Sequence, residues 1–303
     1  MKHNRHDQRG VILIGLMVVL IVASGLTFLH RANGSNATAI ERDAKTMAAL
    51  LAARDALLAR ATLDQNRPGS LPCPDTDNDG IADLAFPNCT AYVGWLPWRT
   101  LDLNDPRDAV GERLWYVLSP NFNDGNTAIN SNTTTSLTLD GQAGMVALII
   151  APGGTLGAQN RPSNSIADYL DDANGNPATS NRDGDNHFFS GPTDTSFNDR
   201  IIALDSTTLF NVLAMRLLGE IRQAVNAAGG PLPYADSDNN GYADAPANIG
   251  QFPYLEAAYD LPSPTWPASH WYDGLATNGW FSLITYSRTA GSITVSGRKI
   301  SLP

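Results

Sequence analysis

Two acidic segments carry oxygen-bearing side chains at the spacing of a cation-binding loop. Residues 75–83 and 236–244 both follow the pattern Asp-x-Asp-x-Asp/Asn-Gly-x-x-Asp. This spacing places side-chain oxygens at loop positions 1, 3, 5 and 9, a turn-forming Gly at position 6 and a backbone carbonyl at position 7. The predicted ligands are Asp75, Asp77, Asp79, Ile81 and Asp83 in the first loop, and Asp236, Asp238, Asn240, Tyr242 and Asp244 in the second.

A ligand set made only of oxygens favours a hard cation, and calcium (Ca2+) is the predicted ion. Without an ion, carboxylates held so close together would repel one another. The bidentate Glu expected at position 12 is absent, because Phe86 and Ala247 stand there. Each site must therefore be completed by Asp83, by Asp244 or by an acid from elsewhere. The alternative is a pair of Asx-rich turns exposed to solvent.

The two loops belong to a longer internal repeat. Residues 71–83 and 232–244 are identical at 8 of 13 positions. Each copy follows a helix-like stretch, 35–62 and 205–227, and is later followed by a β-like run, 113–118 and 280–287. We therefore expect a duplicated unit of helix, acidic loop and strand.

Composition limits the functions open to the chain. Its 303 residues are enough for one large domain or two small ones. The net charge is −10, which excludes a protein that binds nucleic acid over its whole surface. All but four of its 30 acidic residues are Asp, the acid that favours turns and small oxygen cages over helix surfaces.

The N-terminus has the pattern of a membrane segment. Residues 2–9 are basic overall, and residues 11–29 contain no charge. As a helix, the uncharged run would rise about 28 Å, close to the thickness of a bilayer's hydrocarbon core. The basic flank predicts an N-terminus in the cytoplasm and export of the rest of the chain, which is a single-pass topology. The alternatives are a core helix or a secretory signal cleaved near Ala23-Ser24-Gly25.

The junction Gln8-Arg9-Gly10-Val11-Ile12 resembles the prepilin leader of type IV pilins and type II secretion pseudopilins. The resemblance implies that a prepilin peptidase cuts after Gly10 and methylates Val11. It also implies a bacterial inner-membrane protein of single-pass topology with its C-terminus in the periplasm. Residues 11–29 would then stay on the protein, contact membrane lipid and pack against other pilin or pseudopilin subunits at the inner-membrane assembly platform. Most members of the family carry Glu where this chain has Gly15, and this departure favours a minor or tip subunit.

The chain has two cysteines, Cys73 and Cys89. In an exported chain, a pair at close range usually forms a disulfide, which here would close a loop around the first acidic segment. A transition-metal site is the alternative, but no Cys-x-x-Cys with His is present. A third acidic stretch, from Asp168 to Asp185, has irregular spacing that fits a mobile loop as well as a metal site.

These features together predict an α+β fold. A long membrane-spanning N-terminal helix would be followed by a pilin-like headpiece with an antiparallel sheet, internally duplicated. The expected segments are a leader (1–10), a transmembrane and amphipathic helix (11–62), a first headpiece unit (63–204) and a second helix, loop and strand unit (205–303). Residues 145–151 and 292–302 are expected to be strands.

The predicted function is to assemble with other subunits into a filament. The motifs His-Glu-x-x-His and Gly-x-Ser-x-Gly are absent, so no enzymatic activity is expected. We expect a minor pilin or pseudopilin-like structural subunit with a calcium-stabilised head outside the cytoplasm. The alternatives are an exported calcium-binding adhesin and a secreted hydrolase. A mature N-terminus at Val11 would indicate the first function, and one near Gly25 or Leu26 would indicate the others.

Overall fold

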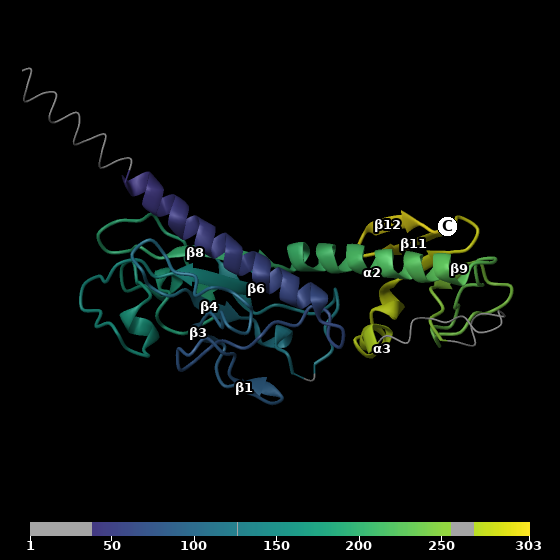
Figure 1. Ribbon diagram of the computed structural model, residues 1–303, viewed down its shortest axis with the longest axis horizontal. Coiled ribbons are helices and arrows are strands. Elements are labelled where there is room, and N and C mark those ends of the chain that lie inside the picture. Colours follow the sequence, from purple (N-terminus) through teal and green to yellow (C-terminus); the bar gives the residue numbers. More distant parts are fainter. Residues whose placement is uncertain (1–37, 126, 256–269) are drawn as a thin grey trace, which may run out of the picture. The chain divides into compact units, whose positions relative to one another are not determined.

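The computed structural model describes residues 38–125, 127–255 and 270–303 (Figure 1). Contacts divide the chain into two units, Met1–Ala48 and Ala49–Pro303. The described part of the first unit is helical, and this helix runs over residues 38–63. Within the second unit its buried positions are Leu50, Ala53, Leu57 and Ala61, spaced three or four residues apart as one helix face requires.

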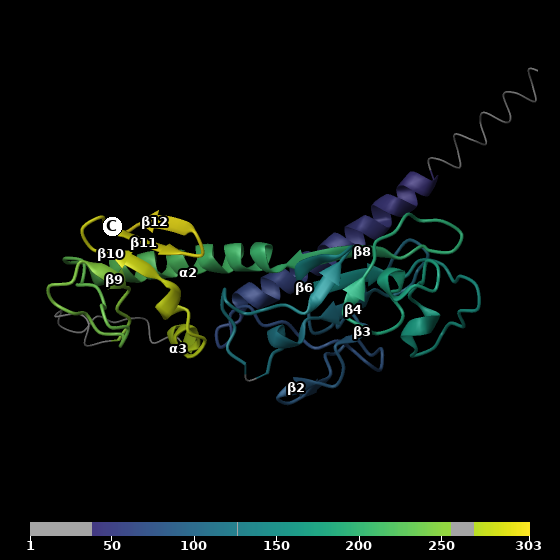
Figure 2. The same ribbon diagram turned by 180° about the vertical axis from the view of Figure 1, so that it is seen from behind.

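The larger sheet of the second unit has six strands (Figure 2). Its order is β3-β4-β6-β5-β7, and β8 also pairs with β6. The pairings are antiparallel except for β5 with β7, which are parallel. The strands are β3 (Val93–Trp95), β4 (Trp115–Leu118), β5 (Leu137–Leu139), β6 (Gln142–Ala151), β7 (His187–Phe188) and β8 (Arg200–Asp205).

Both faces of this sheet are buried. Along β4, Tyr116 packs into the main core, while Trp115 and Val117 pack into a second core on the opposite face with Tyr169. Residues of β6 alternate between the same two cores, as Ile149 and Ile150 do. A strand buried on both faces is apolar at consecutive positions, which explains the uninterrupted apolar run in β6.

The smaller sheet contains four antiparallel strands in the order β12-β11-β10-β9. Its strands are β9 (Ile249–Gln251), β10 (Thr285–Ser287), β11 (Ser292–Val295) and β12 (Arg298–Ser301). A separate hairpin pairs β1 (Leu84–Ala85) with β2 (Asn88–Cys89). Short 3-10 helices are η1 (Pro120–Phe122), η2 (Ile166–Asp168), η3 (Pro177–Thr179) and η5 (Phe281–Leu283).

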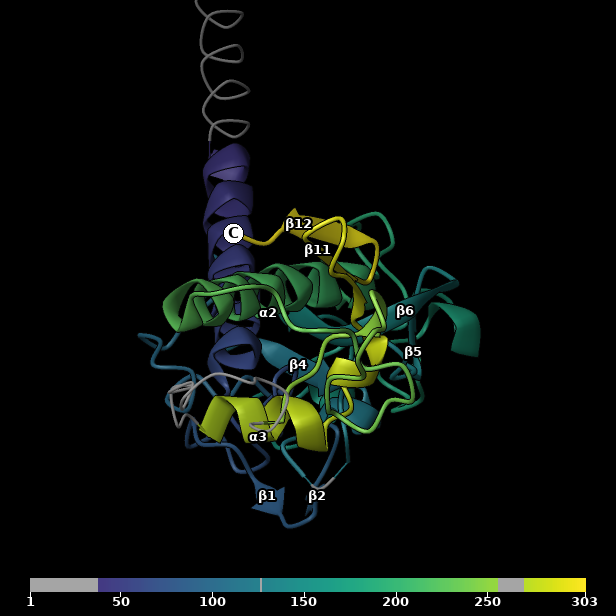
Figure 3. The ribbon, with the colours of Figure 1, turned by 90° about the vertical axis from the view of Figure 1, so that its right-hand side faces the viewer.

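Helix α2 (Ser206–Ala228) follows β8 directly and contacts strands of both sheets. The Asp205 side chain caps its first turn by accepting a hydrogen bond from the Thr208 backbone N–H at 2.8 Å. Gly229, at φ 64°, ends the helix. Figure 3 shows α2 beside β11 and β12, with the short helix α3 (His270–Thr277) on the same unit.

The two halves of this unit repeat one arrangement. A helix precedes an acidic loop in each half, and four sheet neighbours follow in the matching orders β3-β4-β6-β8 and β9-β10-β11-β12. Gly94 pairs with Tyr116 in the first sheet, and Gly250 pairs with Tyr286 in the second. Each acidic loop therefore has an equivalent set of neighbouring strands.

The predicted fold class is wrong in its architecture. The described residues form a curled, sheet-rich fold with three helices, over residues 38–63, α2 and α3, and without a membrane-spanning helix. Long segments rich in Asn, Asp, Gly and Pro separate the strands, because these residues favour turns over regular helices.

The predicted single-pass inner-membrane topology is also wrong. Across the part of the chain that the structure describes, no helix combines the length and the apolar character needed to span a bilayer. The two long helices carry charges, such as Arg54 and Asp55 in the first and Arg216 and Glu220 in α2. Residues 11–29, on which this prediction rested, lie outside the described residues, as do the processing residues Gly10 and Val11.

Candidate metal centre

Each acidic loop is joined to the edge of a sheet at its first predicted ligand, which is position 1 of the loop. Asp75 exchanges two backbone hydrogen bonds with Trp95 of β3, at 3.0 and 2.8 Å. Asp236 makes the same pair with Gln251 of β9, at 3.1 and 2.8 Å. The backbone of position 1 is therefore an extension of the sheet in both loops.

The carboxylate at position 1 organises the turn that follows it. Asp75 is fully buried, and its Oδ1 accepts hydrogen bonds from the backbone N–H groups of Asp77 and Asn78 at 3.1 and 2.6 Å. Its Oδ2 accepts a third from Gly80 at 2.6 Å. Burial raises the pKa of Asp75, these backbone donors oppose that rise, and the Asp79 charge adds to it.

The second loop repeats this arrangement. Asp236 is fully buried and accepts hydrogen bonds from the backbone of Asn240 at 3.2 Å and of Gly241 at 2.7 Å. In both loops the bond from position 6 to position 1 folds the chain back on itself. The chain between these positions must therefore wind around one point.

The structure brings together the ligands predicted at positions 1, 3 and 9. One oxygen from each of Asp75, Asp77 and Asp83 lies within 4.8 Å of the others, and Asp236, Asp238 and Asp244 form a matching group. The carboxylate at position 9 is held by hydrogen bonds from the residue at position 2. The Thr76 backbone N–H and hydroxyl both donate to Asp83 Oδ2, and those of Ser237 donate to Asp244 Oδ2. The hydrogen bonds from Ser237 lower the pKa of Asp244.

Positions 5 and 7 are arranged differently. Asp79 lies outside the group of clustered carboxylates, and its Oδ1 accepts a hydrogen bond from the Ile81 backbone N–H at 2.7 Å. Asn240 Oδ1 accepts from Tyr242 at 2.8 Å. The side chains of Ile81 and Tyr242 are exposed, as expected if position 7 contributes its backbone carbonyl.

Backbone conformation explains the residue types at positions 4 and 6. Gly80 and Gly241 have φ angles of 89° and 90°, which a glycine adopts without strain. Asn78 and Asn239, at 67° and 61°, are also left-handed, and Asn is among the side chains that tolerate this region best. The shared Asn-x-Gly of the two loops therefore reflects the shape of the turn.

A second repeated segment supports the loops, and the sequence reasoning missed it. Residues 93–99 (VGWLPWR) match residues 249–255 (IGQFPYL) in a Gly, a large apolar residue, a Pro and an aromatic residue at the same spacing. A Cβ added at Gly94 would lie 2.4 Å from the Asp75 carbonyl oxygen, and one at Gly250 would lie 2.2 Å from that of Asp236. The signal was present in the sequence as an extension of the repeat beyond residue 83.

A buried tyrosine fixes the start of each loop. The Tyr116 hydroxyl donates to the Pro72 carbonyl at 3.2 Å, and the Tyr286 hydroxyl donates to the Pro233 carbonyl at 2.8 Å. Burial raises the pKa of both hydroxyls, so they remain protonated donors at neutral pH. The two Leu-Pro pairs at the head of the repeat therefore have a structural role.

The predicted disulfide between Cys73 and Cys89 is present and ties the first loop to β2. Replacing both cysteines with serine should lower the free energy of unfolding by about 3 kcal/mol in the chain-entropy view, since the closed loop spans 16 residues. Urea unfolding of the oxidised wild type and the double variant would measure the difference. Equal stabilities of the wild type and the double variant, with and without reductant, would contradict this expectation. The second loop has Tyr234 in place of Cys73 and therefore lacks an equivalent disulfide.

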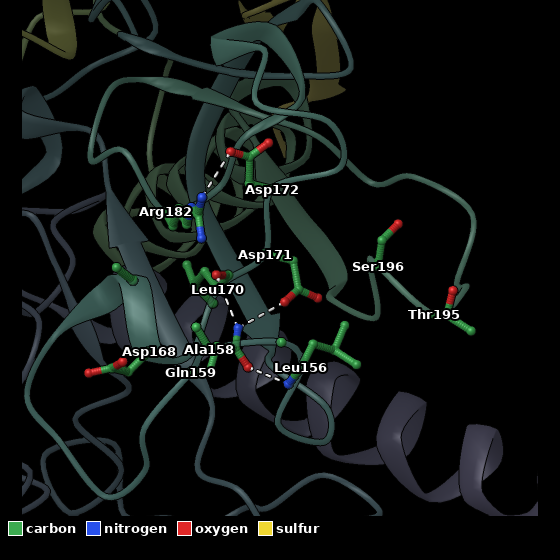
Figure 4. A pocket seen from close by; sticks show the side chains of 12 residues that line it. Leu156, Ala158, Gln159, Asp168, Leu170, Asp171, Asp172, Arg182, Thr195 and Ser196 are labelled. Atoms are coloured by element: carbon green, nitrogen blue, oxygen red, sulfur yellow. Dashed lines mark hydrogen bonds and ion pairs between the residues drawn. The ribbon is translucent and has the colours of Figure 1, made fainter.

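The third acidic stretch contributes to a buried cluster. Asp171 Oδ2 accepts hydrogen bonds from the backbone of Asn198 and Asp199, while Asp199 Oδ2 accepts from the Asp171 backbone and the Asn181 amide. Asp171 also borders a pocket of about 500 Å³ with a mixed polar and apolar lining, where Gln159 donates to it at 2.9 Å (Figure 4). Within the described residues, the groups of three or more acids that could hold a metal are the two loops, and this stretch is not among them.

The Asp171–Asp199 pair predicts a pH dependence of stability. The pKa of Asp199 is raised well above its usual 3.8 because burial removes the carboxyl from water and the Asp171 carboxylate repels its negative charge, while Asn181 and Arg161 act in the opposite direction. Burial also raises the pKa of Asp171. A raised pKa means that the folded state holds the proton more tightly than the unfolded state does. The stabilisation of the folded protein that results is present at low pH and is lost as pH rises through the folded-state pKa.

The free energy of unfolding of Asp199→Asn should therefore equal that of the wild type near pH 3.8, the ordinary pKa of Asp, and exceed it as pH rises. The gap should grow by about 1.4 kcal/mol per pH unit until the folded-state pKa is passed. Melting curves of both proteins across pH would measure it, with Asp183→Asn, an exposed acid in the same stretch, as the control. A wild type and variant that differ by the same amount at every pH would show that folding does not raise the pKa of Asp199.

Comparison of the chain with protein-family models, curated proteins and solved structures finds no match.

Proposed function

We propose that this protein is a non-enzymatic structural subunit of a type IV pilus or type II secretion-type filament, and that two calcium ions stabilise its head. One ion would bind Asp75, Asp77 and Asp83 in the first loop, and the other would bind Asp236, Asp238 and Asp244 in the second. Asp79, Asn240 and the carbonyls of Ile81 and Tyr242 complete the proposed ligand sets.

The observation that carries the calcium proposal is the convergence of three carboxylates in each of two separate loops. In each loop the carboxylates come within 4.8 Å of one another, and position 1 is fully buried. Both clusters consist of hard oxygen donors, which suit calcium better than a transition metal. A divalent cation would remove the mutual repulsion of the carboxylates and stabilise the folded chain.

Melting with and without calcium tests this part of the proposal. An ion that binds the folded chain stabilises it by about 2.7 kcal/mol per site when its free concentration is 100 times the dissociation constant. We expect excess calcium to raise the melting temperature and a chelator to reverse the change. The double variant Asp77→Asn, Asp238→Asn should no longer respond, because each site loses an exposed carboxylate ligand.

The assembly part of the proposal rests on the leader-like residues 8–14. The intact mass of the mature protein tests it, with a methylated N-terminus at Val11 as the expected result. Gly10→Val should block cleavage and abolish co-purification with filaments. A mature N-terminus near Gly25 or Leu26 would contradict assembly and would support the adhesin or the hydrolase.

A further inference from the structure

The two loops differ in what holds position 4. In the first loop, Arg113 Nη1 lies 2.6 Å from both the carbonyl oxygen and the side-chain Oδ1 of Asn78. In the second loop the matching residue, three before the shared tyrosine, is Leu283, which has no side-chain donor. Both asparagines are left-handed, but only in the first loop does the residue three before the shared tyrosine hold the asparagine through a side-chain hydrogen bond.

Arg113 is itself held in place. Its Nε donates to Asp105 Oδ1 at 2.9 Å, and the same carboxylate accepts a hydrogen bond from Arg107 at 2.6 Å. Its guanidinium lies 5.7 Å from the ring centre of Trp98, and a Cβ added at Gly80 would lie 2.6 Å from that ring. Asp105 and Trp98 therefore fix the guanidinium on which Asn78 depends.

We propose that Arg113 is a positioning residue for the first cation site, a proposal that rests on the calcium function proposed above. By bonding both oxygens of Asn78, Arg113 holds the turn in its left-handed form before the ion arrives, so that Asp75 and Asp77 already converge. The first loop should consequently bind calcium more tightly than the second. Charge alone would act in the opposite direction, because a guanidinium near the site repels a cation.

Terbium, a calcium substitute that luminesces when a nearby tryptophan is excited, can report on the first loop through Trp98. In an Asp238→Asn background, which disables the second loop, Arg113→Gln should weaken terbium and calcium binding roughly tenfold, as loss of an outer support of a metal site typically does. Arg113→Lys should also bind more weakly, because a single ammonium cannot hold Asn78 and Asp105 together. Arg182→Gln, which removes an exposed arginine that bonds Asp172, should bind as the parent does.

Unchanged or tighter binding by Arg113→Gln would overturn the inference, and so would full affinity in Arg113→Lys. A lower melting temperature without calcium, combined with unchanged affinity, would show that Arg113 stabilises the fold only. If the parent protein and the wild type bind neither terbium nor calcium, it is the proposed function that fails.

Discussion

Replacing Asp75 with alanine is expected to lower the free energy of unfolding by about 4 kcal/mol even when calcium is absent. The reason is that one fully buried carboxylate accepts backbone hydrogen bonds from Asp77, Asn78 and Gly80. Hydrogen bonds to a charged group contribute about 1.5–3 kcal/mol each, and a buried N–H left without an acceptor adds its desolvation cost. Urea unfolding in a chelator would measure the loss.

Asp77→Ala is the matched control. Asp77 is exposed, and its side chain accepts one long hydrogen bond, from the Asp79 backbone at 3.2 Å. Its loss should change stability by no more than about 0.5 kcal/mol in chelator. In calcium, both variants should lose the stabilisation provided by the first site. Equal stability of the two variants in chelator would contradict the structural role of Asp75.

Gly94→Ala is expected to destabilise the protein by about 4 kcal/mol or more. The added Cβ would meet the Asp75 carbonyl oxygen at 2.4 Å and the Pro74 side chain at 3.0 Å. The obstructing atom is backbone that pairs the loop with β3, so it cannot move aside without breaking the pairing. Such a clash belongs to the severe class of core substitutions. Gly250→Ala should have a similar effect, through the Asp236 carbonyl at 2.2 Å.

Gly219→Ala provides the opposite control. This glycine lies inside α2, and a Cβ there would meet no atom within 4 Å. Because alanine favours a helix over glycine by about 1 kcal/mol, this variant should be slightly more stable than the wild type. Thermal or urea unfolding of the three glycine variants would measure the contrast. A Gly94→Ala protein as stable as the wild type would contradict the close approach of loop and strand.

The acidic loops were predictable because their chemistry is local. Ligand spacing, the turn glycine and the repeat at residues 71–83 and 232–244 all lie within a few residues of one another. The structure brings together positions 1, 3 and 9 of both predicted sites. It also shows that Asp79 lies apart from this group, a detail that spacing alone does not reveal.

Supports that come from distant parts of the chain were not predictable in this way. Gly94 and Arg113 matter because β3 and β4 fold back onto the first loop. The repeat of residues 93–99 at 249–255 marks Gly94 without showing what it contacts, and Arg113 belongs to no motif. Helix periodicity was also ambiguous. In the helix over residues 38–63, the large apolar residues Ile40 and Met47 are exposed, whereas the buried face contains Ala53 and Ala61. Alanines mark a face packed closely against neighbours, and a pattern search based on large apolar residues overlooks them.

Calcium binding by both loops can be tested by the number of calcium ions bound per chain, measured by equilibrium dialysis on the full-length protein. We expect two ions for the wild type, one for Asp77→Asn, one for Asp238→Asn and none for the double variant. A wild-type chain that binds no calcium at millimolar concentrations, or a double variant that binds as many ions as the wild type, would show that the loops are not calcium sites.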